Sequence, residues 1–192
     1  MKRLSQKRYD KIQEYVTRIL FSYAFLIFPF DIESFIRIMP KVELKYYREY
    51  ESPLLLRKVS DDGFSYMRLD GVYLIVINDA QPIERQRFTM AHELGHFVLG
   101  HFSKKDLDED TKEAEANFFE GRFLAPNWAI NRLKSKDVWS ISSAFGISAE
   151  SAMYRYRNYN NWFIYGQPMT ELESQMSEYC FFKEVELGMY VE

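Results

Sequence analysis

The sequence predicts an α+β fold in which helices pack around one small β-sheet. Residues 41–50 and 64–78 alternate or run apolar as strands do, and turn sequences at Asp61-Asp62-Gly63 and Asp70-Gly71 separate them. Apolar side chains recur at helical spacing on both sides of these stretches. With 192 residues, of which 47% are hydrophobic and 17% aromatic, the chain can bury a core as one domain with additions.

A helix is expected at the N-terminus, within residues 1–28, where one stripe of apolar side chains follows helical spacing: Tyr9, Ile12, Val16, Leu20, Tyr23 and Ile27. The apolar run over residues 19–28 is too short to span a bilayer, and no small-residue cleavage site follows it. We therefore expect a helix packed on the core and ended by Pro29. Asp31 is placed to cap a second helix over Ile32–Met39.

Charge and cysteine content narrow the classes of function. The net charge is −3 and the sequence pI is about 5.7, so no general electrostatic force draws the chain to nucleic acid. The single cysteine, Cys180, excludes an internal disulfide and suits a reducing compartment such as the cytoplasm.

The most informative motif is His92-Glu93-Leu94-Gly95-His96. Two histidines four residues apart lie on one face of a helix, so both imidazoles can reach one ion. Glu93 lies about 100° round the helix from His92, where it can hold a water on the metal without ligating it. The three histidines of the chain all fall within ten positions, and apolar residues at helical spacing supply a packing face: Phe88, Ala91, Leu94 and Val98.

A catalytic zinc takes three protein ligands and a water, so one more ligand is required. Residues 113–126 predict a second helix that ends near Pro126, with small residues that permit close packing on a neighbour. Glu113 and Asn117 share one face of this helix. We predict Glu113 as the third ligand and Asn117 as the residue that holds a ligand histidine through its other ring nitrogen. The alternatives for the third ligand are Glu115, His101 and Asp108.

Together these segments resemble the ImmA/IrrE family of zinc metallopeptidases. The resemblance rests on Arg87–His96, on Glu113–Phe119, and on Phe123–Pro126, and it covers residues 30 to 160. The chain departs from the family pattern at three packing positions: Glu120, Phe123 and Ala125. The resemblance implies a small zincin-like, gluzincin-type peptidase domain with a sheet beside the active-site helix. An edge strand of that sheet is then available to pair with an extended substrate.

The resemblance also implies a zinc-dependent endopeptidase. Zn²⁺ held by His92, His96 and Glu113 would activate a water, and Glu93 would accept its proton. The sequence does not identify the oxyanion donor, for which Arg155 and Tyr154 are candidates. Relatives act in the bacterial cytoplasm, often in phages or mobile elements and otherwise in stress responses, on a repressor that carries a helix-turn-helix. We therefore expect a specific protein substrate and no membrane association.

The rest of the chain predicts four segments: an N-terminal helix over 1–28, a metallopeptidase core over 29–136, a helix-turn-helix-like segment over 137–162 and a C-terminal extension over 163–192. The third segment fits either a module that recognises the partner protein or one that binds DNA. The first is favoured because basic residues are few there.

Two other functions stay open at this point. One is a binding regulator that sequesters its partner repressor without cutting it, with the metal serving structure. The other is a nucleic-acid-binding regulator, which the acidic balance disfavours. Glu93 favours catalysis, because a structural metal site needs no base beside it.

Overall fold

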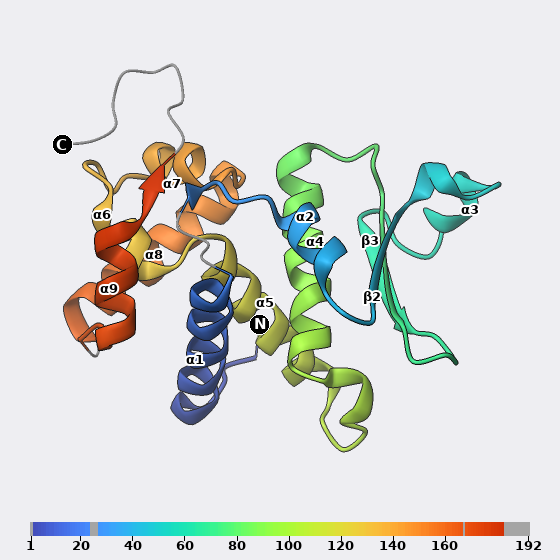
Figure 1. Ribbon diagram of the computed structural model, residues 1–192, viewed down its shortest axis with the longest axis horizontal. Coiled ribbons are helices and arrows are strands. Elements are labelled where there is room, and N and C mark those ends of the chain that lie inside the picture. The colour runs from blue at the N-terminus through green and yellow to red at the C-terminus, as the bar shows by residue number, and fades with distance from the viewer. Residues whose placement is uncertain (1, 24–26, 167, 183–192) are drawn as a thin grey trace. The chain divides into compact units, whose positions relative to one another are not determined.

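The computed structural model describes residues 2–23, 27–166 and 168–182, whose course Figure 1 shows. The expected α+β class is confirmed. The helices are α1 (Gln6–Ser22), α2 (Ile32–Ile38), η1 (Tyr47–Glu49), α3 (Pro53–Leu56), α4 (Ile83–Val98), η2 (His101–Ser103), α5 (Glu109–Leu124), α6 (Asn127–Arg132), α7 (Val138–Phe145), α8 (Ala149–Tyr165) and α9 (Glu171–Tyr179). The strands are β1 (Ile27–Phe28), β2 (Val42–Tyr46), β3 (Gly63–Met67), β4 (Tyr73–Ile77) and β5 (Phe181–Phe182).

The chain divides into two compact units. The first combines the residues up to Tyr9 with Asp31–Glu120, and the second combines Asp10–Phe30 with the chain from Gly121 onward. Helices α1 and α5 each contribute to both units. This division cuts through two of the four segments expected from the sequence, 1–28 and 29–136.

The first unit is built on a three-stranded sheet in the order β2-β4-β3. Strand β2 runs parallel to β4 with Leu44 opposite Ile75, and β3 runs antiparallel to β4 with Ser65 opposite the same residue. All five residues of β4 are buried, as suits a central strand covered by helices. Helix α4 packs on β4 and β3, and α2 packs on β2 and α4. The sheet therefore serves as the platform for α4.

Helix α2 begins as expected, whereas α1 ends earlier. The Asp31 side chain accepts a hydrogen bond from the Ser34 amide at 3.0 Å and caps α2. Helix α1 stops at Ser22, and Ile27, expected on its apolar stripe, begins β1 instead. Pro29 restricts the preceding residue, Phe28, to an extended conformation, which suits a strand here. Phe28 then satisfies its backbone by pairing in parallel with β5 near the other end of the chain.

The second unit has an aromatic core centred on Phe28. This side chain is fully buried, and its ring centroid lies 5.1 Å from that of Phe145 and 5.7 Å from that of Trp128. Phe30 and Phe182 complete the group around Phe28 at 6.1 and 5.9 Å. The contacts of Phe28 with Phe30, Phe145 and Trp128 are edge-to-face, an arrangement that aromatic pairs prefer, and its contact with Phe182 is tilted.

Helices α7 and α8 form the expected helix-turn-helix-like pair. Helix α7 is capped by Asp137 and ends at Gly146, whose φ of 60° lies in the left-handed region that glycine tolerates. Ser148 accepts a hydrogen bond from the Ser151 amide at 3.2 Å and caps α8. Helix α8 continues to Tyr165, beyond the boundary expected at residue 162. Helix α9 and strand β5 follow α8 within the described part of the expected extension over 163–192.

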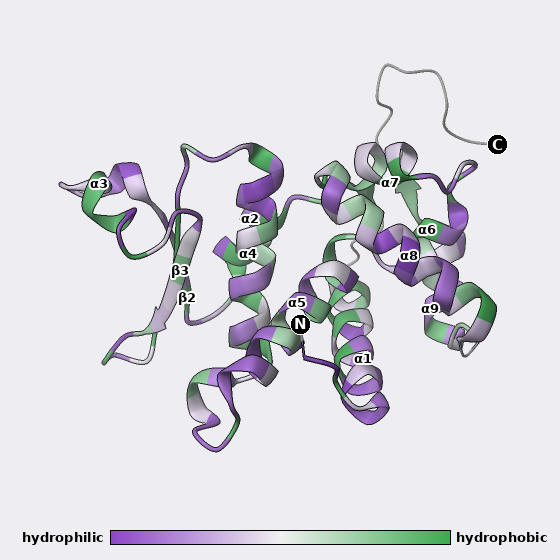
Figure 2. Ribbon diagram, turned by 180° about the vertical axis from the view of Figure 1, so that it is seen from behind, coloured by the Kyte–Doolittle hydropathy of each residue, from purple (hydrophilic) through white to green (hydrophobic). Residues whose placement is uncertain are grey.

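The apolar surface is unevenly distributed. Figure 2 shows α3 as a largely apolar helix, and Leu54 and Leu55 there are 71% and 57% exposed. In the part of the chain that the structure describes, no helix has the length and apolar character needed to cross a bilayer.

A hydrogen bond between Tyr46 and Glu33 ties β2 to α2 and provides a test of this packing. The Tyr46 hydroxyl donates to Glu33 Oε2 at 2.6 Å, and Arg37 donates to Oε1 of the same carboxylate at 2.8 Å. The Tyr46 hydrogen bond lowers the pKa of Glu33 against the opposing effect of burial, and Arg37 lowers it further. We expect Tyr46→Phe to reduce the free energy of unfolding by about 1 kcal/mol near neutral pH.

The pH dependence of this loss follows from the sign of the shift. Because the folded pKa of Glu33 lies below its unfolded value, the linked stability is present above the unfolded pKa and is lost as pH falls through the folded pKa. Urea unfolding near neutral pH and at about pH 3.5 should therefore show the deficit of the variant shrinking in acid. Tyr66→Phe, at an exposed position of β3, is the control. An equal deficit at both pH values would contradict the account.

Candidate metal centre

Helix α4 presents the two motif histidines side by side. Its apolar face, which includes Met90, Ala91 and Leu94, is buried, and His92 and His96 project from another face. Their Nε2 atoms lie 3.1 Å apart. The spacing of four residues thus places two imidazole nitrogens at one point, as expected from the sequence.

Helix α5 brings Glu113 to the same point because the two helices approach closely at Gly95. A Cβ atom added to Gly95 would lie 3.0 Å from Phe119 Cδ1 and 3.4 Å from Ala116 Cα. Only glycine leaves this contact unstrained. Glu113 Oε2 lies 3.3 Å from His92 Nε2, and Oε1 lies 3.4 Å from His96 Nε2.

These three distances match the donor set of a tetrahedral zinc site. Ligand bonds of about 2.0–2.2 Å at tetrahedral angles place neighbouring donor atoms about 3.4 Å apart. The observed separations of 3.1, 3.3 and 3.4 Å lie close to that value. Among the described residues, His92, His96 and Glu113 form the group of three histidine, cysteine or acidic side chains that can hold a metal ion. The residues present fit Zn²⁺.

The electrostatics of His96 and Glu113 suit metal binding, whereas the pKa of His92 is raised, against the opposing effect of burial, by its hydrogen bond to Glu113. Burial, followed by the neighbouring His92, lowers the pKa of His96 to about 4, so this imidazole is neutral near pH 7. The hydrogen bond between Glu113 and His92 lowers the pKa of the Glu113 carboxyl. A neutral imidazole and an ionised carboxylate are the forms that ligate a cation.

Glu93 is held by the sheet, which the sequence did not reveal. Ser65 on β3 donates a short hydrogen bond to Glu93 Oε2, and its Oγ lies 2.6 Å from the Tyr73 hydroxyl on β4. Burial raises the pKa of Glu93, which favours a group that exchanges protons. No local signal identifies Ser65, because its place depends on the register between β3 and β4.

The alternative third ligands have other roles in the structure. His101 and Glu115 are buried and contact each other, with His101 Nε2 at 2.9 Å from Glu115 Oε2. Asp108 caps the start of α5 through the Thr111 amide and pairs with Lys2. None of the three joins the cluster of His92, His96 and Glu113.

Asn117 does not hold a ligand histidine in the way that we expected. The Nδ1 atom of His92 is buried without a hydrogen-bond partner, and His96 Nδ1 lies 3.0 Å from His101 Nδ1 instead. The partner of His96 is therefore not Asn117 on α5 but His101, which lies in the turn after α4.

Arg155 has a structural role that the sequence did not suggest. It is 3% exposed, donates to the Ala125 carbonyl at 2.8 and 3.1 Å, and donates to Asn127 Oδ1 at 2.8 Å. These bonds satisfy backbone and side-chain acceptors where α5 ends and α6 begins. Tyr154 is exposed on α8 of the same unit. Contact of either residue with an oxyanion stays a prediction.

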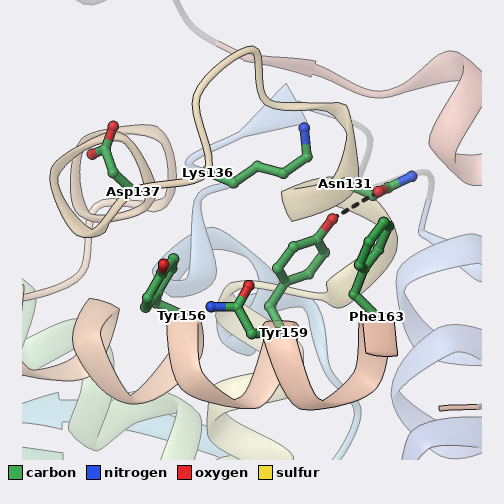
Figure 3. Close-up of a pocket in the computed structure, with 7 residues that line it drawn as sticks. Asn131, Lys136, Asp137, Tyr156, Tyr159 and Phe163 are labelled. Atoms are coloured by element: carbon green, nitrogen blue, oxygen red, sulfur yellow. Dashed lines mark hydrogen bonds between the residues drawn. The ribbon is translucent and has the colours of Figure 1, made fainter. Parts of the chain in front are cut away.

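The second unit contains a hollow of about 540 Å³ beside α8 (Figure 3). Its floor is formed in part by Tyr159, which donates a hydrogen bond to Asn131 Oδ1 at 2.8 Å. None of the residues predicted for the site lines this hollow. Its lining consists of Asn131, Lys136, Asp137, Tyr156, Tyr159, Asn160 and Phe163. It therefore adds nothing to the metal centre.

Comparison with known proteins identifies related chains. The family model described as the IrrE N-terminal-like domain, a peptidase family, matches residues 51–157. The phage-like element PBSX protein XkdA of Bacillus subtilis (strain 168) is 28% identical over 100 residues, which is 48% of this chain and 50% of that protein. The chain thus spans about half the length of this curated relative. No solved structure matches.

Loss of the Glu113 carboxylate should abolish most zinc binding. We expect Glu113→Ala to weaken zinc affinity by more than the roughly 10–100-fold that loss of an outer hydrogen-bond partner costs. Chelator competition on purified protein measures this, with Glu109→Ala, an exposed glutamate on the same helix, as control. Unchanged zinc affinity in Glu113→Ala would contradict this ligand set and return Glu115, His101 and Asp108 to consideration.

The close contact of α4 with α5 gives a second test. Gly95→Leu places side-chain atoms where Phe119 and Ala116 already lie, so we expect a loss of about 1–3 kcal/mol in unfolding free energy. Because the helices must separate, zinc affinity should fall as well. Thermal unfolding and zinc titration measure the two effects. A variant with wild-type zinc affinity would show that the site does not depend on this approach.

Proposed function

This chain belongs to the IrrE N-terminal-like peptidase family, and on that premise we propose that it is a zinc-dependent endopeptidase with a specific protein substrate. The observation that carries the proposal is the meeting of three donor atoms at 3.1–3.4 Å with a glutamate held beside them. A structural metal site has no need of that glutamate.

The chemistry follows from the residue types. A bound zinc ion supplies a Lewis acid that lowers the pKa of water and polarises the substrate carbonyl. His92, His96 and Glu113 would hold it. Glu93 accepts a proton from the attacking water as the new C–O bond forms, and it delivers that proton to the amine nitrogen as the C–N bond breaks. Ser65 orients the Glu93 carboxylate for both transfers.

Strand β3 is suited to bind the substrate backbone. Within the described residues it pairs with β4 along one edge, and Ser65 on this strand contacts Glu93. An extended peptide added along the other edge of β3 would run past Glu93 as an additional strand. This arrangement selects an unfolded or loop segment of a protein.

The proposed substrate is a repressor with a helix-turn-helix. The relative from Bacillus subtilis is named as a protein of a phage-like element, which suits a regulator encoded by a mobile element. We further propose that the chain acts in the bacterial cytoplasm on such a repressor.

Glu93→Gln should separate zinc binding from catalysis. We expect the variant to keep about one zinc per chain and to lose cleavage by about 100-fold or more, because a neutral amide cannot accept the proton. The assay follows cleavage of repressors encoded beside the gene, by mass spectrometry, with Glu84→Gln on the same helix as control.

Two outcomes would contradict this proposal. Cleavage retained in Glu93→Gln would remove Glu93 as the base. Tight binding of a repressor by the zinc-loaded wild type, with no cleavage, would instead favour a regulator that sequesters its partner.

A further inference from the structure

Outside the predicted ligands, a continuous series of hydrogen bonds runs from His96 to the N-terminus. His96 Nδ1 lies 3.0 Å from His101 Nδ1, and His101 Nε2 lies 2.9 Å from Glu115 Oε2. The other oxygen of Glu115 accepts a short hydrogen bond from Arg8. His101 and Glu115 are 4% and 5% exposed, so water does not compete for the contact between them, whereas the Arg8 side chain is 42% exposed.

The series is consistent in only one direction of proton donation. His96 Nε2 faces the other two ligand atoms and must offer its lone pair to bind a metal, so the proton of its neutral ring lies on Nδ1. His101 Nδ1 then accepts, and the His101 proton lies on Nε2, from which it is donated to Glu115. A carboxylate is an acceptor only, and Arg8 is a donor only, so both ends fit this direction.

The two ligand histidines differ in their support. Nδ1 of His92 is buried with no hydrogen-bond partner in the described structure, whereas Nδ1 of His96 ends the series from Arg8. Partners of this kind fix the tautomer and the orientation of a metal-binding imidazole. The His96 ring is therefore the one whose position is set by residues remote in sequence.

The N-terminal segment Lys2–Tyr9 is anchored to the first unit at four residues. Leu4 is buried, Lys2 pairs with Asp108 at 2.8 Å, and the Tyr9 ring lies 4.6 Å from that of Phe118. Arg8 forms the fourth anchor through Glu115. The segment lies outside residues 51–157, which the family model matches.

We propose that Arg8, Glu115 and His101 are positioning residues that fix His96 for metal binding, so that segment Lys2–Tyr9 completes the metal centre. Without Arg8, Glu115 is a buried carboxylate that faces a neutral imidazole alone, which is unfavourable. The Glu115 side chain then moves toward water and the orientation of both imidazoles is lost. The inference rests on the metal site of the proposed function and does not rest on peptide cleavage.

The first measurement is made on metal-free protein. Long-range ¹H–¹⁵N correlation spectra identify which ring nitrogen of each histidine carries the proton. We expect His96 in the wild type to be protonated at Nδ1, and Glu115→Ala to show a mixture of both tautomers. Arg8→Ala should move the same signals, whereas Lys7→Ala, an exposed neighbour, should leave them in place. A merely structural role would not shift this tautomer.

The second measurement is zinc affinity by chelator competition. We expect His101→Phe and Glu115→Ala to weaken zinc binding by about 10–100-fold and Arg8→Ala by about 3–10-fold. Arg8→Lys keeps the positive charge and should recover most of the loss. If Glu115→Ala fails to fold, Glu115→Gln keeps the size of the side chain and removes its charge, and it should still weaken zinc binding by about 3–10-fold.

Distinct outcomes separate this inference from the proposed function. Wild-type zinc affinity in both Arg8→Ala and the Glu115 variant, or an Nε2 proton on His96 in the metal-free wild type, would overturn it. A wild type that takes up no zinc would overturn the metal site and this inference together. Zinc binding that shows the expected losses, with no cleavage of any repressor, would overturn the peptidase alone and support the positioning series.

Discussion

The approach of α4 and α5 at Gly95 is the constraint on which the site depends. The two histidines already meet through the geometry of a single helix, but a third donor on another helix must come within about 3.4 Å of each. A Cβ atom at Gly95 would lie 3.0 Å from Phe119 and 3.4 Å from Ala116, so any side chain here crowds the helix that carries Glu113. The sheet orients Glu93, and the turn after α4 and the N-terminal segment support His96. All three contact helices whose spacing is set at Gly95.

Three glutamates near the metal centre have different roles because their partners and burial differ. Glu113 is half-exposed and faces two imidazoles, so it is available as a ligand. Glu93 is held by a hydroxyl from the sheet in a buried setting that raises its pKa, which suits proton transfer. Glu115 is buried between an arginine and a histidine and acts as a fixed charge. Identical side chains thus differ by partner and burial.

Much of the site was predictable because its signals are local. The meeting of the two histidines and the position of Glu113 on one face of its helix follow from helical periodicity. The Asp31 cap follows from the preference for aspartate at the start of a helix. The role of Ser65 was not predictable, because it requires the register of β3 on β4. Arg8 and Glu115 are 107 positions apart, and no periodic pattern connects them. The short strand β1 that follows α1 depends on a partner, β5, near the far end of the chain.

Arg155 illustrates the limit of reasoning from residue type. Arginine is a common partner of anions, yet Arg155 donates hydrogen bonds to the Ala125 carbonyl and to Asn127 inside the second unit. Similarly, the three alternative ligands have other contacts: His101 and Glu115 pair with each other, and Asp108 caps α5. The other contacts of each histidine and acidic residue therefore distinguish a metal ligand from a residue with a structural role.

The most direct test of the account is zinc K-edge X-ray absorption on protein purified without added metal. The account predicts about one zinc per chain, with two imidazole nitrogens and oxygen ligands at about 2.0–2.2 Å, and no sulfur. A sulfur ligand, a single imidazole, or the absence of zinc would contradict the site built by α4 and α5.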